Sequence, residues 1–404
     1  MSSESVPDVR LSVPKGFRIG AAACGIKNSG KSDIALILTE KPAVAAGVYT
    51  TNRVCAAPVI LDRQRTPTEN FRAVITNSGN ANACTGEQGM LDSVSMTELT
   101  ARSCGISADQ VLVMSTGIIG THLDMKKIQS GIAAAAESLG SSPDALFAAA
   151  DGILTTDLVR KVASTAMEID GESTMITGIA KGSGMIAPNM ATMLGVIMTD
   201  AKLSPAMAES MLRSVCDSTF NAISVDGHTS TNDTVLLIAT GEAQSNEISE
   251  AATSTFLRGL NDVCGKLAHA IVDDGEGATH VMEIMVTGCA SEQDAMTIAK
   301  AIGASPLVKT AIAGADPNWG RIVSAAGYAG PTFDPINVSL HVNGNLLFES
   351  GRPATFDQAM VSDSMNSNRV ISIEIEIGEG DASACFKSCD LTAEYVRINA
   401  EYHT

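Results

Sequence analysis

Residues 181–194 read Lys-Gly-Ser-Gly-Met-Ile-Ala-Pro-Asn-Met-Ala-Thr-Met-Leu. A glycine run leads through a proline to a single threonine, Thr192, which lies among apolar residues. A threonine hydroxyl is a weak nucleophile at neutral pH unless a neighbouring base removes its proton. Cleavage of the Ala191–Thr192 bond would supply that base, because it frees the α-amine of Thr192. We therefore interpret Thr192 as an N-terminal nucleophile that the chain makes for itself.

The chemistry of this cleavage needs only the residues at the bond. The Thr192 hydroxyl can add to the Ala191 carbonyl, the amide then becomes an ester, and water releases the α-amine. An α-amine titrates near about 8, close to working pH, and is tethered beside the hydroxyl it must deprotonate. A glycine-rich loop before an apolar strand is also a common structural turn, so this stretch alone is only a hypothesis.

Further motifs lie on both sides of this stretch. Before it come GVYTTN at 47–52, NSGNANACTG at 77–86 and STGIIG at 115–120; after it come DGHTSTNDT at 226–234, DGEGAT at 274–279, GADPNWGR at 314–321 and RINAEYHT at 397–404. Together they resemble the glutamate N-acetyltransferase (ornithine acetyltransferase) family of arginine biosynthesis. Members of that family cleave themselves before the threonine of an Ala-Thr-Met-Leu motif. The resemblance extends nearly end to end.

The resemblance implies an α/β fold of layered sheets and helices, of the ornithine acetyltransferase-like (N-terminal-nucleophile-like) type. It implies an alpha chain of residues 1–191 and a beta chain of residues 192–404, which fold together and form a heterotetramer of two alpha and two beta chains. The implied reaction moves acetyl from N2-acetyl-L-ornithine to L-glutamate through an acetyl-threonine intermediate. Its products are L-ornithine and N-acetyl-L-glutamate. Whether acetyl-CoA is a second acetyl donor stays open.

Site residues follow from the resemblance position by position. Thr116 and Gly117 would stabilise the oxyanion of the tetrahedral intermediate. Lys181 would bind the substrate carboxylate and Glu276 its ammonium group. The full substrate-binding set is Thr155, Lys181, Thr192, Glu276, Asn399 and Thr404. From the residues alone, Thr116 and Gly117 also fit a turn that ends a strand, Lys181 and Glu276 fit exposed loop charges, and Asn399 and Thr404 fit an ordinary chain end.

This chain departs from the family pattern at three places. Leu158, Val159 and Arg160 follow the Thr-Thr-Asp motif where the family usually has threonine and then a proline before lysine. His228 replaces a common acidic residue, and His280 replaces a common lysine. None of these changes affects the predicted nucleophile.

Two other functions compete with acetyl transfer. A self-processed amidohydrolase or aminopeptidase would use the same nucleophile with water as the acceptor. A nucleotide-binding protein is suggested by residues 25–32, GIKNSGKS, which fit the phosphate-binding pattern G-x-x-x-x-G-K-[ST]. That pattern requires a helix directly after the loop. Residues 33–39 instead resemble a buried strand.

Composition narrows the class of protein without naming it. The 404 residues carry a net charge of −18 and show no basic stripe, which argues against a nucleic-acid partner. We expect no membrane span, no export signal and a cytoplasmic location. Nine cysteines without a C-x-x-C pair indicate reduced thiols. Cys385 and Cys389 lie four residues apart with no flanking histidine, which favours a structural role for them over a metal site. The expected reaction needs no metal and no bound cofactor, with acetyl-CoA left as a co-substrate.

Local patterns predict several helices and strands. Ser204-Pro205 begins a helix through Val215, another begins near Ser249, and a third spans residues 291–302 and ends at Gly303. Apolar residues at three- and four-residue spacing predict one buried face for the second helix: Phe256, Leu260, Val263, Leu267 and Ile271. Residues 371–377 alternate as a strand, and residues 338–348 form a hairpin around Asn343-Gly344.

Overall fold

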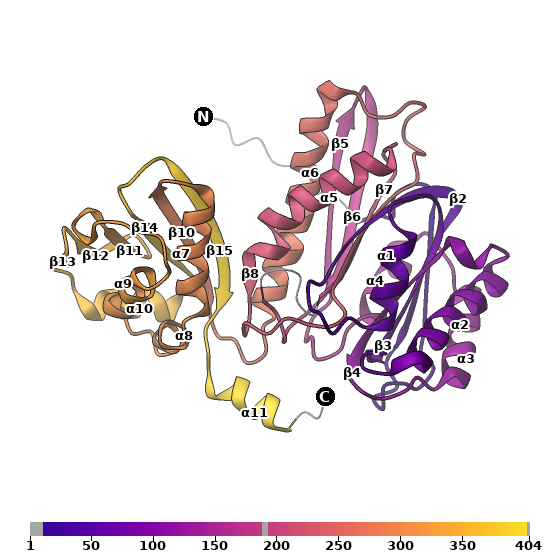
Figure 1. Cartoon of the computed structure of the whole chain (residues 1–404), viewed down its shortest axis with the longest axis horizontal. Coiled ribbons are helices and arrows are strands. Elements are labelled where there is room, and N and C mark those ends of the chain that lie inside the picture. The colour runs from indigo at the N-terminus through magenta and orange to yellow at the C-terminus, as the bar shows by residue number, and fades with distance from the viewer. Residues whose placement is uncertain (1–10, 188–192, 402–404) are drawn as a thin grey trace.

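The computed structural model describes residues 11–187 and 193–401, and the chain forms two lobes (Figure 1). In these ranges the strands form one sheet of eight strands and another of seven. The first sheet and its helices come from residues before β10 (Val281–Cys289). Apart from the short β8 (Ile223–Ser224), the second sheet comes from residues after position 280. The fold is thus mixed α/β with layered sheets and helices, as predicted.

The first sheet has the strand order β4-β3-β2-β9-β7-β6-β5, with β1 pairing β2. Parallel pairing joins β3 to β4 and β7 to β9, and the other neighbours are antiparallel. β6 and β7, which flank residues 182–193, pair with Lys181 opposite Leu194. The strands are β1 (Phe17–Ala22), β2 (Ile34–Tyr49), β3 (Thr68–Asn80), β4 (Val111–Ile118), β5 (Lys161–Ile169), β6 (Glu172–Lys181), β7 (Leu194–Thr199) and β9 (Thr234–Ala239).

Helices cover both faces of this sheet. Ile197 and Leu237 belong to a core with α5 (Pro205–Ser218) and α6 (Glu250–Asp273), whereas Val196 and Leu236 belong to a core with α4 (Pro143–Gly152). Because neighbouring residues of a strand face opposite sides, α4 lies opposite α5 and α6. The β3–β4 end is covered by α1 (Ala57–Arg65), α2 (Gly86–Cys104) and α3 (Met125–Glu137). Within the described ranges, no helix is long and apolar enough to cross a membrane.

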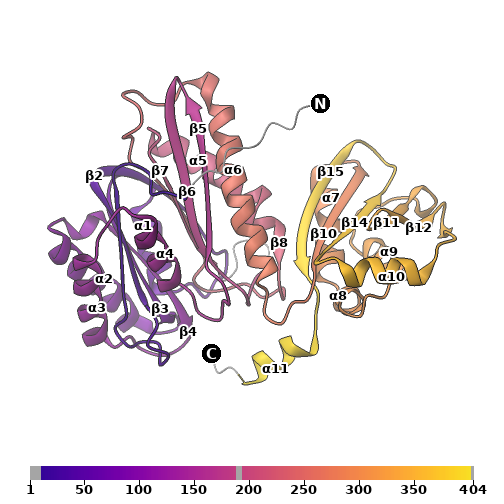
Figure 2. The same cartoon turned by 180° about the vertical axis from the view of Figure 1, so that it is seen from behind.

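The second lobe packs its own sheet, ordered β13-β12-β11-β14-β10-β15-β8, around a separate core. β8 precedes this lobe in sequence but pairs in parallel with β15, and α6 stands between the two sheets (Figure 2). The remaining elements are β11 (Ser339–Val342), β12 (Asn345–Glu349), β13 (Arg352–Pro353), β14 (Val370–Glu376), β15 (Ala382–Cys389), α7 (Glu292–Ala304), α8 (Pro306–Ala313), α9 (Trp319–Gly327), α10 (Gln358–Ser367) and α11 (Ala393–Glu401).

The predicted helix starts are confirmed by their caps. The hydroxyl oxygens of Ser204, Ser249 and Ser291 each accept a backbone N–H in the first turn of α5, α6 and α7. All five apolar residues predicted for one face of α6 are buried. The hairpin is also confirmed, since Asn343 and Gly344 both adopt positive φ between β11 and β12.

The predicted end of α7 at Gly303 is wrong. The helix continues to Ala304, and Gly303 lies inside it. A Cβ on Gly303 would come within 2.7 Å of the Phe386 ring. Glycine therefore allows the helix to pack closely on β15, and Ser305 ends α7 while capping α8.

The prediction that residues 33–39 form a strand, and not the helix that a phosphate-binding loop at residues 25–32 requires, is confirmed. β2 begins at Ile34, so a strand follows the loop instead of a helix. The Asp33 carboxylate accepts the backbone N–H groups of Cys24 and Ile26, both at 2.7 Å. These N–H groups are therefore not available to cradle a phosphate.

Gly303→Ala should lower the free energy of unfolding by about 1–3 kcal/mol, because the added methyl overpacks the Phe386 ring. Gly265→Ala in α6 is the matched control. Its added Cβ meets only Thr219 Cγ2, at 3.9 Å. It should stabilise the protein by up to about 1 kcal/mol through helix propensity. Urea unfolding measures both, and equal stability of the two variants would contradict the packing argument.

Candidate active site

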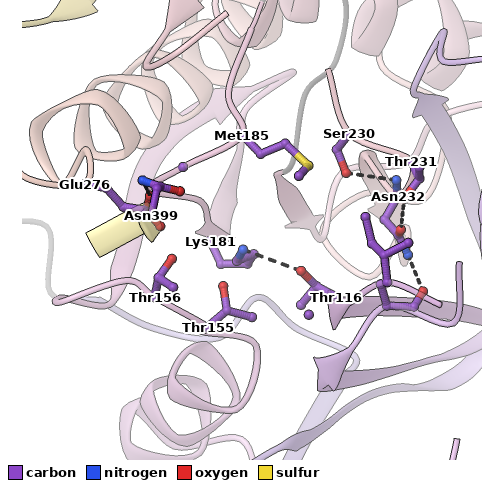
Figure 3. Close-up of a pocket in the computed structure, with 14 residues that line it drawn as sticks. Thr116, Thr155, Thr156, Lys181, Met185, Ser230, Thr231, Asn232, Glu276 and Asn399 are labelled. Atoms are coloured by element: carbon purple, nitrogen blue, oxygen red, sulfur yellow. Dashed lines mark hydrogen bonds between the residues drawn. The ribbon is translucent and has the colours of Figure 1, made fainter. Parts of the chain in front are cut away.

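Six predicted residues from five separate stretches of sequence line one pocket: Thr116, Gly117, Thr155, Lys181, Glu276 and Asn399. In Figure 3, Lys181 lies between Thr116 on one side and the two threonines 155 and 156 on the other. Glu276 and Asn399 close the pocket beyond them. The predicted Ala191, Thr192 and Thr404 lie outside the described residues.

The oxyanion candidates lie at the carboxyl end of β4. Gly117 has φ +135°, and a Cβ there would come within 2.3 Å of the Gly79 carbonyl carbon. Only glycine allows strands β3 and β4 to approach this closely. The Asn232 side-chain amide donates to the Ser115 carbonyl at 2.8 Å and to the Ala81 carbonyl at 2.6 Å. This buried amide holds the strand end beside Thr116 in place.

Lys181 belongs to a buried cluster of two lysines and two aspartates. Asp157 accepts Lys161 Nζ at 2.8 Å, and its other oxygen lies 3.9 Å from Lys181 Nζ. Lys161 Nζ also donates to Asp274 at 2.6 Å. Lys181 Nζ donates to Thr116 Oγ1 at 3.5 Å, which links the cluster to the oxyanion candidates.

Burial and charge oppose each other in this cluster. Burial alone would raise the pKa of Asp157, but the ammonium groups of Lys181 and Lys161 hold it below its ordinary value. Burial lowers the pKa of Lys181, and Asp157 partly opposes that change. Asp157 therefore stays a carboxylate, and it supports a lysine charge that still faces the pocket.

Glu276 and Asn399 come together from the two lobes. Asn399, on α11, donates its side-chain amide to Glu276 Oε2 at 2.9 Å. Close packing brings the segments together, because a Cβ on Gly184 would lie 2.4 Å from Glu276 Oε2. A Cβ on Gly277 would likewise lie 2.5 Å from the Tyr395 nitrogen. The Asn399 amide thus holds the Glu276 carboxylate at the pocket, and Gly184 and Gly277 leave room for the close packing around it.

Met193, the first described residue after Thr192, is firmly held. Its N–H donates to Asp233 Oδ1 at 2.8 Å, and its carbonyl accepts the Thr234 N–H at 3.2 Å. Asp233 is fully buried, and burial raises its pKa well above the ordinary value. Asp233 follows Asn232, a lining residue, so the chain just after Thr192 is tied to the pocket wall.

Sequence reasoning missed several residues of the pocket and its support. Thr156, Ser230, Thr231 and Asn232 line the pocket. Asp157 and Asp233 support it from behind. All six lie in stretches singled out as motifs, but no sequence signal separated their roles from those of their neighbours.

Neither histidine departure reaches the pocket lining. His228 is exposed, whereas His280 is buried with Nδ1 3.1 Å from Asp390 Oδ2. In the described ranges, no group of three or more histidine, cysteine or acidic side chains could hold a metal ion.

The pocket combines the ammonium group of Lys181, the carboxylate of Glu276, and a hydroxyl beside a strand-end glycine. Donors at that strand end could stabilise an oxyanion. With the comparisons that follow, the mixed α/β fold and this pocket define an acyltransferase. The ArgJ family model matches residues 18–404, and the chain belongs to the ArgJ family.

Relatives match over nearly their whole length. The arginine biosynthesis bifunctional protein ArgJ of Rhodopirellula baltica is 50% identical over 395 residues, which is 97% of this chain and 96% of that protein. The protein of the same name from Symbiobacterium thermophilum is 45% identical, covering 98% of each chain. A crystal structure of argJ from Bacillus halodurans is 36% identical with a TM-score of 0.50, covering 51% of this chain and 98% of its own.

Asp157→Asn should lower the free energy of unfolding by about 3–5 kcal/mol, because it leaves two buried ammonium groups without their shared carboxylate. Asp151→Asn is the matched control, since it breaks only the half-exposed pair with Arg160. The control should cost less than about 1 kcal/mol. Urea unfolding of both variants measures the difference, and similar small losses would show that the buried cluster is not a structural requirement.

Proposed function

We propose that this protein transfers acetyl from N2-acetyl-L-ornithine to L-glutamate, releasing L-ornithine and N-acetyl-L-glutamate. The observation that carries the proposal is the gathering of six predicted residues, from five stretches of sequence, around one pocket. The name of the relatives, arginine biosynthesis bifunctional protein, agrees with this reaction. Free amino acids and their acetyl derivatives as substrates fit the cytoplasmic location expected from the sequence.

The roles follow from charge and geometry. Thr192 attacks the acetyl carbonyl, and its α-amine takes the hydroxyl proton. Thr116 and Gly117 stabilise the oxyanion. Ornithine leaves, and the amine of glutamate then attacks the acetyl-threonine ester and regenerates the hydroxyl.

Substrate binding uses opposite charges at two ends of the pocket. Lys181 binds the α-carboxylate that both amino-acid substrates carry, and Glu276, held by Asn399, binds an ammonium group. Thr155 lines the pocket beside Lys181 and offers a neutral hydrogen-bonding group. Thr404 completes the proposed substrate-binding set from the chain end.

Cleavage between Ala191 and Thr192 would leave an alpha chain, 1–191, and a beta chain, 192–404. β6 lies in the first piece and β7 in the second, and their ladder runs from Ile176 opposite Thr199 to Lys181 opposite Leu194. The two pieces would therefore stay joined within one sheet. The Bacillus halodurans chain aligns over 98% of its own length with only 51% of this chain, which fits a relative present as two chains. We extend the proposal to a heterotetramer of two alpha and two beta chains.

Thr192→Ala should leave an uncleaved chain with at least about a thousandfold lower activity, as expected when a nucleophile is removed. Intact mass spectrometry under denaturing conditions, with N-terminal sequencing, should find two fragments in the wild type. One fragment should begin Thr192-Met193-Leu194. A cleaved and active Thr192→Ala protein would end the proposal.

The identity of the acceptor separates transfer from hydrolysis. With radiolabelled acetylornithine, we expect N-acetylglutamate when glutamate is present and almost no free acetate when it is absent. A self-processed amidohydrolase would instead release acetate at the same rate with or without glutamate.

Lys181→Met should raise KM for acetylornithine and glutamate roughly 10- to 100-fold, because a charge-assisted contact is lost. Cleavage should still occur. In the wild type, the Lys181 charge is present at low pH and is lost as pH rises through its lowered pKa. KM should therefore begin to rise below the ordinary lysine value of about 10.4. This rise should be missing in Lys181→Met, and its persistence there would assign it to another group.

A further inference from the structure

The last helix of the chain, α11, contacts the stretch that leads to Thr192, although none of its own residues is buried. Figure 2 shows this helix beyond the end of β15, running from the second lobe back toward the first. An isolated helix of nine residues is marginal in water, so α11 depends on its contacts with the rest of the protein. Two of those contacts lead to residues 183–186.

The first contact passes through Asp226. Tyr395 on α11 donates its hydroxyl proton to Asp226 Oδ2 at 3.1 Å. The same carboxylate accepts the backbone N–H groups of Met185 at 2.6 Å and Ile186 at 3.0 Å. It also accepts the backbone N–H of His228 at 3.1 Å. Asp226 therefore joins the last helix to the stretch that leads to the proposed cleavage site.

This carboxylate holds an uncommon backbone conformation. Met185 has φ +57°, in the left-handed region that residues other than glycine seldom adopt. The carbonyl of the next residue, Ile186, accepts the backbone N–H groups of Val225, Asp226 and Gly227 at 2.9, 3.2 and 3.2 Å. Both backbone polar groups of Ile186 are thus held by one turn of the chain.

The second contact passes through Glu276. Asn399 on α11 donates its side-chain amide to Glu276 Oε2 at 2.9 Å. The Glu276 backbone N–H in turn donates to the Ser183 carbonyl at 2.8 Å. The beginning of the helix is tied to the same loop, because Thr392 donates its hydroxyl proton to the Gly277 carbonyl at 2.7 Å. When α11 is docked, it therefore constrains the stretch before Thr192 through two separate contacts.

These contacts anchor a short segment that contains the bond proposed for cleavage. One anchor is Ile186 and the other is Met193, with residues 187–192 between them. Attack of the threonine hydroxyl on the preceding carbonyl is intramolecular, so its rate depends on how often the two groups meet in the reacting geometry. Fixing both ends of a short segment limits the conformations that it can adopt. Loss of one anchor should therefore slow the attack.

We propose that Asp226 and Tyr395 are positioning residues for self-cleavage, so that the chain cleaves itself rapidly only after α11 has docked. The inference rests on the proposed function, because it concerns the step that frees the α-amine of Thr192. α11 is the last helix of the chain, and it docks once the second lobe has formed and returned it to the first. Cleavage would then follow assembly of the β6–β7 ladder, which keeps the two pieces joined.

The covalent step is the one already proposed. The Thr192 hydroxyl oxygen forms a bond to the Ala191 carbonyl carbon, the carbon–nitrogen bond breaks, and the hydroxyl proton passes to the released nitrogen. Water then hydrolyses the ester, which leaves a carboxylate on Ala191, restores the Thr192 hydroxyl and releases one proton to the solvent. Asp226 and Tyr395 exchange no proton in either step, because they act through the backbone that they hold.

The test follows self-cleavage of the full chain as it is made by cell-free translation, with samples denatured at timed intervals and analysed by intact mass spectrometry. Tyr395→Phe removes only the hydroxyl and should slow cleavage about tenfold or more, because a hydrogen bond to a charged group is lost. Tyr328→Phe is the matched control. Tyr328 follows α9 in the second lobe and is 64% exposed, so this variant should cleave at the wild-type rate.

A second pair of variants displaces the helix itself. Gly277→Ala places a Cβ 2.5 Å from the Tyr395 backbone nitrogen and should push α11 away. Gly105→Ala is the matched control, because Gly105 has φ +68° against +70° at Gly277 and its added Cβ meets nothing within 4 Å. Both variants put a side chain on a left-handed backbone, so only the clash with α11 distinguishes them. Gly277→Ala should slow cleavage and Gly105→Ala should not.

A double-mutant cycle assigns the effect of Tyr395 to its contact with Asp226. Asp226→Asn should slow cleavage at least as much as Tyr395→Phe, because an amide nitrogen cannot accept the hydrogen bonds that a carboxylate oxygen accepts. Adding Tyr395→Phe to Asp226→Asn should slow cleavage little further, since the hydroxyl has already lost its charged partner. Effects that multiply would show that the two residues act independently and would overturn the link.

Stability separates positioning from a general loss of structure. In the uncleavable Thr192→Ala background, Tyr395→Phe should leave the midpoint of urea unfolding nearly unchanged. A precursor that is largely unfolded would assign slow cleavage to unfolding and overturn the inference. Wild-type cleavage rates in Tyr395→Phe and Gly277→Ala would also overturn it and leave the proposed function standing. A wild-type chain that is never cleaved would instead count against the proposed function.

Discussion

One buried carboxylate, Asp157, holds two buried lysines at the end of the first sheet, and the candidate site is built around it. Its oxygens also accept the backbone N–H groups of Thr155 and Gly182. Charges removed from water are tolerated only with close partners. The contacts of Asp157 therefore hold together the loop before β5, the end of β6 and the beginning of the segment that leads to Thr192.

The pocket is assembled from parts of the chain that meet only in the folded protein. Strand β4 brings Thr116 and Gly117, β6 brings Lys181, and the loop after α6 brings Glu276. The tail α11 leaves the second lobe and runs back toward the first, as Figure 1 shows, and places Asn399 on Glu276. Gly117 and Gly277 allow close backbone contacts at these meeting points, and Gly184 allows close approach of the Glu276 side chain. The second lobe thus contributes to the site by returning its last helix to it.

Local rules were sufficient where a structure depends on neighbouring residues. Serine caps before proline or acidic residues predicted where helices begin, and Asn343-Gly344 predicted the hairpin. Local rules failed at Gly303, because that glycine is needed for close packing against Phe386, which lies on a strand 83 residues away in sequence. Local rules also rejected the phosphate-loop pattern correctly, since a strand follows residues 25–32 and Asp33 occupies the N–H groups that such a loop would offer.

The sequence by itself determined the family and predicted the six residues that line the pocket, because each of these is carried by short motifs. Tertiary structure alone decided which other residues hold the pocket residues in place. Asp157, Asn232 and Asp233 act through contacts with residues 24 to 151 positions away, and no short pattern records such distances. It also decided that residues of the stretches 25–32 and 158–160 line one groove, although they are far apart in the chain.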